Sequence, residues 1–94
     1  MRYQVNRRGV LEPAKSPRRC SIKNAPKWIQ RIGLFTNKSI NCYGAFSCTE
    51  PKSGCKVGLD MDTRRNAMEC AIYTLEQMGY KKFIKQLAKR LKEL

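Results

Sequence analysis

Lysine and arginine side chains are the strongest candidates for functional residues in this sequence. The chain has 94 residues, with 20 Lys and Arg, seven Asp and Glu, no His and a formal net charge of +13. Nine basic and one acidic residue lie in 1–31, three and three in 32–62, and eight and three in 63–94. Like charge crowded at both ends opposes compaction and favours association with a polyanion or an acidic surface. The composition therefore predicts a negatively charged partner.

Two arginines stand where a long helix is expected to begin. Arg64 and Arg65 follow Asp62 and Thr63, either of which can cap a helix by accepting a backbone N–H. In a first turn, cationic side chains oppose the helix dipole, so a contact outside the helix should explain them. Free backbone N–H groups beside guanidinium groups make a good phosphate site. We therefore expect phosphate contacts at this turn.

The leading hypothesis is a small non-enzymatic protein that binds DNA or RNA through the backbone or the shape of the nucleic acid. A nucleoprotein complex is a related partner. No cofactor is expected. The expected contacts come from a basic N-terminal arm, the start of the long helix and a cationic last helix: Arg7, Arg8, Arg18, Arg19, Arg64, Arg65, Lys81, Lys82, Lys85 and Lys89.

The last helix also supports an alternative hypothesis. Phe83, Ile84, Leu87 and Leu91 have the spacing of one apolar helix face. Such a face suits an accessory or inhibitory subunit that docks its helix in a groove of an acidic partner protein, and the helix would then be dispensable for folding. The same cationic helix could lie on an anionic membrane surface, or its charged face could simply be solvated.

Enzymatic chemistry has little support in this sequence. Asp60 and Asp62 could together hold a divalent ion, but an exposed strand position and a helix cap explain them equally. There is no histidine, no glycine-rich phosphate loop, and no Ser or Cys beside a plausible base. We therefore expect a protein that is not an enzyme.

The five cysteines indicate reduced thiols rather than a metal centre. Five and six residues separate Cys42, Cys48 and Cys55, whereas zinc ligand pairs are usually about two to four residues apart. Convergence of these three with Cys20 or Cys70 on a metal remains an alternative, as does a Cys48–Cys55 disulfide under oxidising conditions. The odd number and the absence of a signal-peptide pattern predict an intracellular, cytoplasmic protein with no membrane span.

Two regions must position these residues. Residues 1–23 are expected to form a basic flexible arm, because Pro13 and Pro17 break any helix and few apolar residues are present to offset the entropy of ordering. Tyr3 and Val5 could still anchor part of it. Residues 24–94 are expected to form a single small α+β domain, a three-stranded antiparallel meander covered by C-terminal helices.

Periodicity places the elements of that domain. A short helix follows Pro26 and stops at Gly33, and two amphipathic helices over 63–78 and 83–94 are hinged at Gly79. Between them, period-two patterns predict strands over 34–36, 39–48 and 55–61, with residues 37–38 as a tight turn. The expected register pairs Cys48 with Cys55 and Phe35 with Ile40, which gathers the apolar side chains on one face of the sheet.

The order of short helix, three strands and helix is similar to that of the double-stranded RNA-binding domain. The likeness covers residues 25–79, and the stretch Thr63-Arg64-Arg65-Asn66-Ala67 resembles the basic helix start of that family. Met68 stands where the family has another basic residue, no histidine is available for a loop contact, and residues 80–94 are an addition. The resemblance implies that Arg64 and Arg65 bridge phosphates across a groove and read shape more than sequence.

Overall fold

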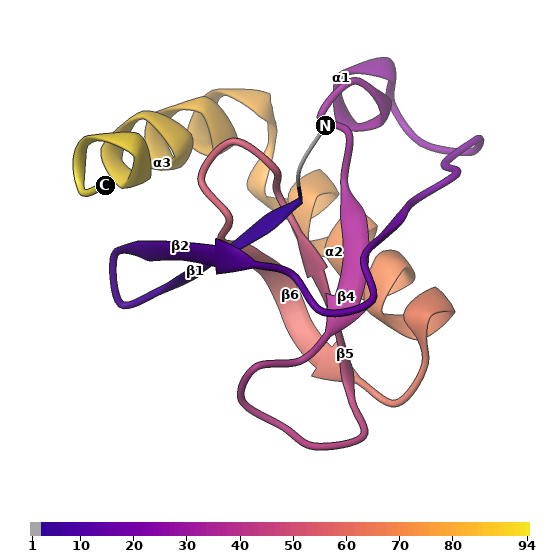
Figure 1. The fold of residues 1–94 in the computed structure, drawn as a ribbon. Coiled ribbons are helices and arrows are strands. Elements are labelled where there is room, and N and C mark those ends of the chain that lie inside the picture. Colours follow the sequence, from indigo (N-terminus) through magenta and orange to yellow (C-terminus); the bar gives the residue numbers. More distant parts are fainter. Residues whose placement is uncertain (1–2) are drawn as a thin grey trace.

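The protein has an α+β fold, as predicted, in which three helices accompany two antiparallel sheets (Figure 1). The computed structural model describes residues 3–94. In chain order the elements are β1 (Gln4–Arg7), β2 (Val10–Pro13), β3 (Arg18–Arg19), α1 (Lys27–Gln30), β4 (Phe35–Lys38), β5 (Phe46–Thr49), β6 (Lys56–Met61), α2 (Arg64–Met78) and α3 (Tyr80–Lys92).

The larger sheet is the centre of the fold and both of its faces are covered. Its strand order is β3-β4-β5-β6, and α2 packs on one face, where Ala67, Ala71 and Leu75 are fully buried. The β1–β2 hairpin covers the other face, in front of the sheet in Figure 1. There the ring of Tyr3 lies 4.6 Å from the ring of Phe35. The sheet is thus sandwiched between a helix and a hairpin.

The structure differs from the expected flexible arm and three-stranded meander. Residues 4–13 form the hairpin, and β3 adds a fourth strand at the edge of the sheet by pairing with β4. The hairpin is stabilised by burial of Val5, which is 4% exposed, and by a turn in which Arg8 and Gly9 both have positive φ. Two positive φ values at the centre of a two-residue loop match the twist of the flanking strands.

The predicted strand register is wrong. Residues 37 and 38 lie inside β4, Phe35 pairs with Thr49, and Cys48 pairs with Val57 rather than Cys55. A loop over residues 39–45 connects β4 to β5, because the Ser39 hydroxyl accepts two backbone N–H bonds there instead of extending a strand. The pattern of alternation could not reveal a side-chain-capped loop of this kind.

An irregularity in β6 also departs from the expected strand. Three residues of β6 lie opposite the single residue Ser47 of β5, and Gly58 among them has a φ of 78°. This bulge turns Leu59 outward, where it is 68% exposed. Bulges re-aim side chains in this way, so Leu59 does not join the apolar face that the expected register would give it.

The helical predictions are confirmed. The Thr63 hydroxyl accepts the backbone N–H of Asn66 at 3.0 Å and so caps α2, and Gly79 (φ 82°) separates α2 from α3. The short α1 follows Pro26, and its Trp28 ring lies 5.7 Å from the ring of Phe83 on α3. Phe83 is 8% exposed and belongs to the core, so the first half of α3 is part of the folded domain.

Candidate nucleic-acid interface

Arg64 is tied to the protein's own backbone at the start of α2. Its guanidinium donates to the carbonyl oxygen of Thr36 at 3.2 Å, to the Thr36 hydroxyl at 3.1 Å and to the carbonyl oxygen of Ser16 at 2.8 Å. It also lies over the ring of Phe46, 4.8 Å from the centroid. Arg64 therefore clamps the segment that precedes β3 onto β4 and α2, a role that sequence reasoning did not anticipate.

A second arginine, Arg18, lies near Arg64 and adds to the positive charge around it. Partial burial lowers the pKa of the Arg64 guanidinium, and the charge of Arg18 lowers it further. Arg18 and Arg19 form the edge strand β3, and both are exposed. Arg18 thus lies near Arg64 at the edge of the sheet, whereas Arg19 points to the opposite face because successive strand residues alternate.

Arg65 contrasts with its neighbour. Its side chain is 83% exposed and pairs with Glu69 one turn along α2 at 3.1 Å. Exposed pairs of this spacing contribute only about 0.3–0.5 kcal/mol, so the pair can open easily. Of the two arginines predicted to bind phosphate together, Arg65 is the one whose charged group is directed to solvent.

The two basic ends of the sequence meet in space. A Cβ atom built on Gly9, at the tip of the hairpin, would lie 3.8 Å from the backbone carbonyl oxygen of Glu93. The tip in Figure 1 accordingly lies next to the C-terminal end of α3. We call the group formed by Arg7, Arg8, Lys89, Arg90 and Lys92 the tip cluster. No sequence signal indicated this proximity, because it joins residues at opposite ends of the chain.

A surface cavity adjoins the tip cluster. It has a volume of about 480 Å³ and lies between the hairpin and the loop over residues 39–45, lined by Asn6, Arg7, Arg8, Ile40 and Asn41. The Arg8 guanidinium and the Asn41 amide can donate hydrogen bonds to phosphate oxygens, whereas Arg7 is paired with Glu12 and the Asn6 amide donates to the carbonyl oxygen of Ser53. This arrangement is chemically suited to an anion.

α3 separates its apolar and basic side chains on opposite faces. Lys81, Lys85 and Lys89 follow one another at four-residue spacing and are exposed, as is Lys82. Phe83 and Leu87 face the core, while Ile84 and Leu91 are each 41% exposed. The four predicted apolar partner-binding residues are therefore divided, with two in the core and two open to solvent.

Acidic groups neutralise few of these cations. Within residues 3–94 the ion pairs are Arg7–Glu12, Lys56–Asp60 and Arg65–Glu69, whereas the full chain carries 20 Lys and Arg residues. Glu50 is 3% exposed and accepts hydrogen bonds from the backbone and side chain of Ser53. The basic surface consequently keeps most of its charge.

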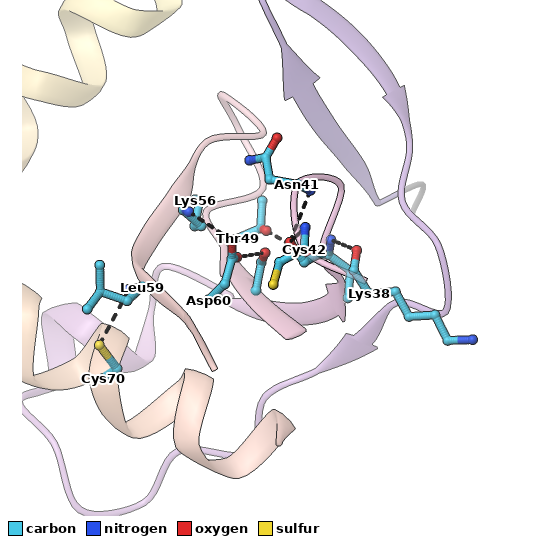
Figure 2. Close-up of polar contacts among 11 residues, drawn as sticks. Lys38, Asn41, Cys42, Thr49, Lys56, Leu59, Asp60 and Cys70 are labelled. Atoms are coloured by element: carbon cyan, nitrogen blue, oxygen red, sulfur yellow. Dashed lines mark hydrogen bonds and ion pairs between the residues drawn. The ribbon is translucent and has the colours of Figure 1, made fainter. Parts of the chain in front are cut away.

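A polar cluster on the hairpin side of the sheet holds β4, β5 and β6 together (Figure 2). The Thr49 hydroxyl donates to the Asn37 side chain at 2.7 Å, and the Ser47 hydroxyl donates to Asp60. Burial raises the pKa of the Asp60 carboxyl, but hydrogen bonds from Ser47 and Lys56 outweigh burial, so the pKa lies below its usual value. Asp60 is therefore a structural carboxylate, matching neither the metal site considered for it nor a freely solvated strand position.

The cysteines are free thiols in the structure. Cys48 and Cys55 are not cross-strand partners, since Cys48 pairs with Val57. Instead Cys20 and Cys48 lie with their sulfur atoms 4.0 Å apart. Among the described residues, His, Cys, Asp and Glu nowhere gather in threes that could ligate a metal ion.

Comparisons with protein-family models, with curated proteins and with solved structures found no match to this chain. Within residues 3–94, none of the helices combines the length and the apolar character that crossing a bilayer requires. The functional assignment consequently depends on the charges and contacts described above.

Proposed function

We propose that this protein is a non-enzymatic nucleic-acid-binding protein that contacts phosphates through its basic surface. The proposal assigns it no cofactor and an intracellular location, where nucleic acids are the abundant polyanions. DNA and RNA are both candidates, because contacts to phosphates do not depend on base sequence.

The observation that carries the proposal is the tip cluster. Arginines of the hairpin and basic residues of α3 come from opposite ends of the sequence, yet the hairpin tip at Gly9 lies beside the backbone of Glu93. Arg7 is paired with Glu12, whereas the ion pairs of the described residues include none of Arg8, Lys89, Arg90 and Lys92, so these four charges are open to an anionic ligand. Binding at such a surface releases counterions from the nucleic acid, which is favourable at low salt.

Two further groups of cations extend the proposed interface. The lysines of α3 form an exposed row, and Arg18 and Arg65 lie near the start of α2, with Arg19 next to Arg18 on β3. Arg64 supports this second group by holding the segment before β3 in place. We propose that Arg64 acts mainly through this support, and that the exposed arginines around it contact phosphate directly.

A salt titration tests the proposal directly. Fluorescence anisotropy with a labelled duplex DNA, and with an RNA of matching sequence, gives the binding constant at several salt concentrations. We expect the logarithm of the constant to fall linearly with the logarithm of salt, with a slope of about −0.9 for each duplex-DNA phosphate contacted. Absence of binding at low salt, or a flat response to salt, would contradict the proposal.

A specific observation favours the alternative of a protein-interaction module. Tyr80, Ile84, Leu91 and Leu94 of the last helix and its end are 41–54% exposed. Apolar side chains flanked by lysines suit a groove on an acidic partner protein. Because Phe83 is in the core, deleting all of 80–94 would damage the fold, and Ile84→Ser with Leu91→Ser is the cleaner test. Loss of binding to an acidic partner protein, with nucleic-acid binding retained, would favour the apolar face.

A further inference from the structure

Cys20 and Cys48 lie together on the side of the sheet that faces α2. Cys20 follows β3, and its backbone N–H donates to the carbonyl oxygen of Leu34 at 2.9 Å. Cys48 is fully buried in β5, and the two sulfur atoms are 4.0 Å apart. A disulfide needs sulfur atoms about 2.05 Å apart, so bond formation requires a small approach. Cys20 can supply it, because the segment from Cys20 to Pro26 has no regular secondary structure.

The two thiols have different environments. Cys20 is half-buried, whereas Cys48 has no exposed surface. The pKa of Cys20 lies below its usual value. The hydrogen bond with Cys48 and the charge of Arg64 both lower this pKa, and together they outweigh burial, which raises it. The hydrogen bond with Cys20 and burial raise the pKa of Cys48. Thiolates are the reactive form, so Cys20 is suited to attack first. Cys48 is placed to resolve by its position, because its sulfur is 4.0 Å from that of Cys20.

We propose that Cys20 and Cys48 form a reversible redox site that reduces a hydroperoxide and closes to a disulfide. The Cys20 sulfur attacks a peroxide oxygen; the sulfur–oxygen bond forms, the oxygen–oxygen bond breaks, and the departing hydroxide takes a proton from solvent. The Cys48 sulfur then attacks the Cys20 sulfenic acid. Its proton leaves with the hydroxide as water while the sulfur–sulfur bond forms. Two thiols are oxidised and hydrogen peroxide becomes two water molecules.

The remaining cysteines provide internal comparisons. Cys42 is exposed, and the Cys55 thiol interacts with the carbonyl oxygen of Ser53. The sulfur of Cys70 accepts the backbone N–H of Leu59 at 3.4 Å (Figure 2). If accessibility alone decided oxidation, Cys42 would react first. Preferential oxidation of the Cys20–Cys48 pair would instead reflect its geometry and the adjacent guanidinium.

Peptide mapping tests the proposal on the full chain. The reduced protein is treated with hydrogen peroxide, blocked with N-ethylmaleimide under denaturing conditions and analysed by mass spectrometry without reductant. A combined digest, with one protease that cuts after aromatic residues and one that cuts after Lys and Arg, isolates Cys48, because Tyr43 and Phe46 separate it from Cys42 and Lys52 separates it from Cys55 and Cys70. We expect a linked peptide pair containing Cys20 and Cys48, and three blocked thiols in place of five.

Variants identify the order of events. Cys48→Ser should leave a sulfenic acid on Cys20 that dimedone traps, and Cys42→Ser should leave the disulfide yield unchanged. Cys20→Ser should leave Cys48 reduced. Circular dichroism shows whether each variant is folded. If a variant does not fold, the peptide map of the wild-type protein still decides whether Cys20 and Cys48 form the disulfide. Oxidation of Cys42 while Cys20 and Cys48 stay reduced would overturn the proposal.

Discussion

At the scale of single residues, the two neighbouring arginines of α2 have opposite environments. Arg64 binds Thr36 and Ser16, which are distant in sequence, whereas Arg65 binds only the next turn of its own helix. Because cations in a first turn oppose the helix dipole, the sequence indicated that these arginines have a partner outside the helix. It could not indicate which, because the carbonyl oxygens that Arg64 contacts belong to Thr36 and Ser16, which only the folded chain brings beside α2.

We predict that Arg64→Ala destabilises the protein far more than Arg65→Ala. Loss of the Arg64 side chain removes three hydrogen bonds and the stacking on the Phe46 ring, and should cost about 2 kcal/mol. Arg65→Ala removes only an exposed pair and should cost at most about 0.5 kcal/mol. Urea unfolding of both variants measures the difference. Equal stability of the two variants would contradict the clamping role of Arg64.

Asp60 provides a prediction about pH. Its pKa is lower in the folded protein than in the unfolded chain, where an Asp carboxyl has a pKa of about 3.9. The unfolded state therefore takes up a proton first as the pH falls, so the stabilisation is complete above about pH 5 and is lost through and below pH 4.

Asp60→Asn should accordingly flatten the dependence of unfolding free energy on pH in this acidic interval, measured by urea unfolding at a series of pH values. Glu76→Gln is the control, because Glu76 is an exposed helical carboxylate. A curve for Asp60→Asn that runs parallel to the wild-type curve below pH 5 would rule out Asp60 as the source.

At the scale of elements, the sequence predicted helices better than strands. Thr63 and Gly79 are local signals, and they do begin and end α2. Strand register depends on distant pairings, and two local irregularities changed it: the loop that Ser39 caps and the bulge at Gly58. The hairpin was missed for a related reason, because Val5 is buried only by contact with the finished sheet.

The bulge yields a prediction that separates close packing from backbone strain. A Cβ on Gly58 would lie 3.1 Å from the Cys70 sulfur and 3.2 Å from the backbone of Ala71, whereas a Cβ on Gly44 would meet nothing within 4 Å. Both residues have positive φ, so both substitutions incur conformational strain of about 1 kcal/mol.

Gly58→Ala should therefore cost about 1–3 kcal/mol more than Gly44→Ala, because β6 and α2 must move apart. Thermal and urea unfolding measure the two variants side by side. If Gly44→Ala is equally destabilising, backbone conformation alone explains the requirement for glycine, and close packing of α2 on β6 is not responsible.

At the scale of the whole molecule, the fold places the hairpin tip of the first basic region beside the end of α3 in the second. The sequence predicted both regions, but only the proximity of Gly9 to Glu93 joins them. The part of α3 beyond Leu87 adds no residue to the buried core among the described residues. Its position beside the hairpin is thus the feature most relevant to the proposed binding.

Charge-removing variants test whether the tip cluster acts as one unit. Arg8→Gln and Lys89→Gln each remove one cation from the tip cluster, and Lys27→Gln removes one from α1 as a matched control with the same change in net charge. For each tip variant, the slope of the logarithm of the binding constant against the logarithm of salt should become shallower by about 0.9 for every duplex-DNA phosphate no longer bound. In the double variant the change in slope should be about twice as large.

Lys27→Gln should leave the slope close to that of the wild type, because α1 lies away from the hairpin tip (Figure 1). Fluorescence anisotropy at a series of salt concentrations supplies the slopes, and circular dichroism verifies folding. If Lys27→Gln lowers the slope as much as Arg8→Gln does, net charge rather than the tip cluster governs binding, and the cations spread over the rest of the molecule become the interface.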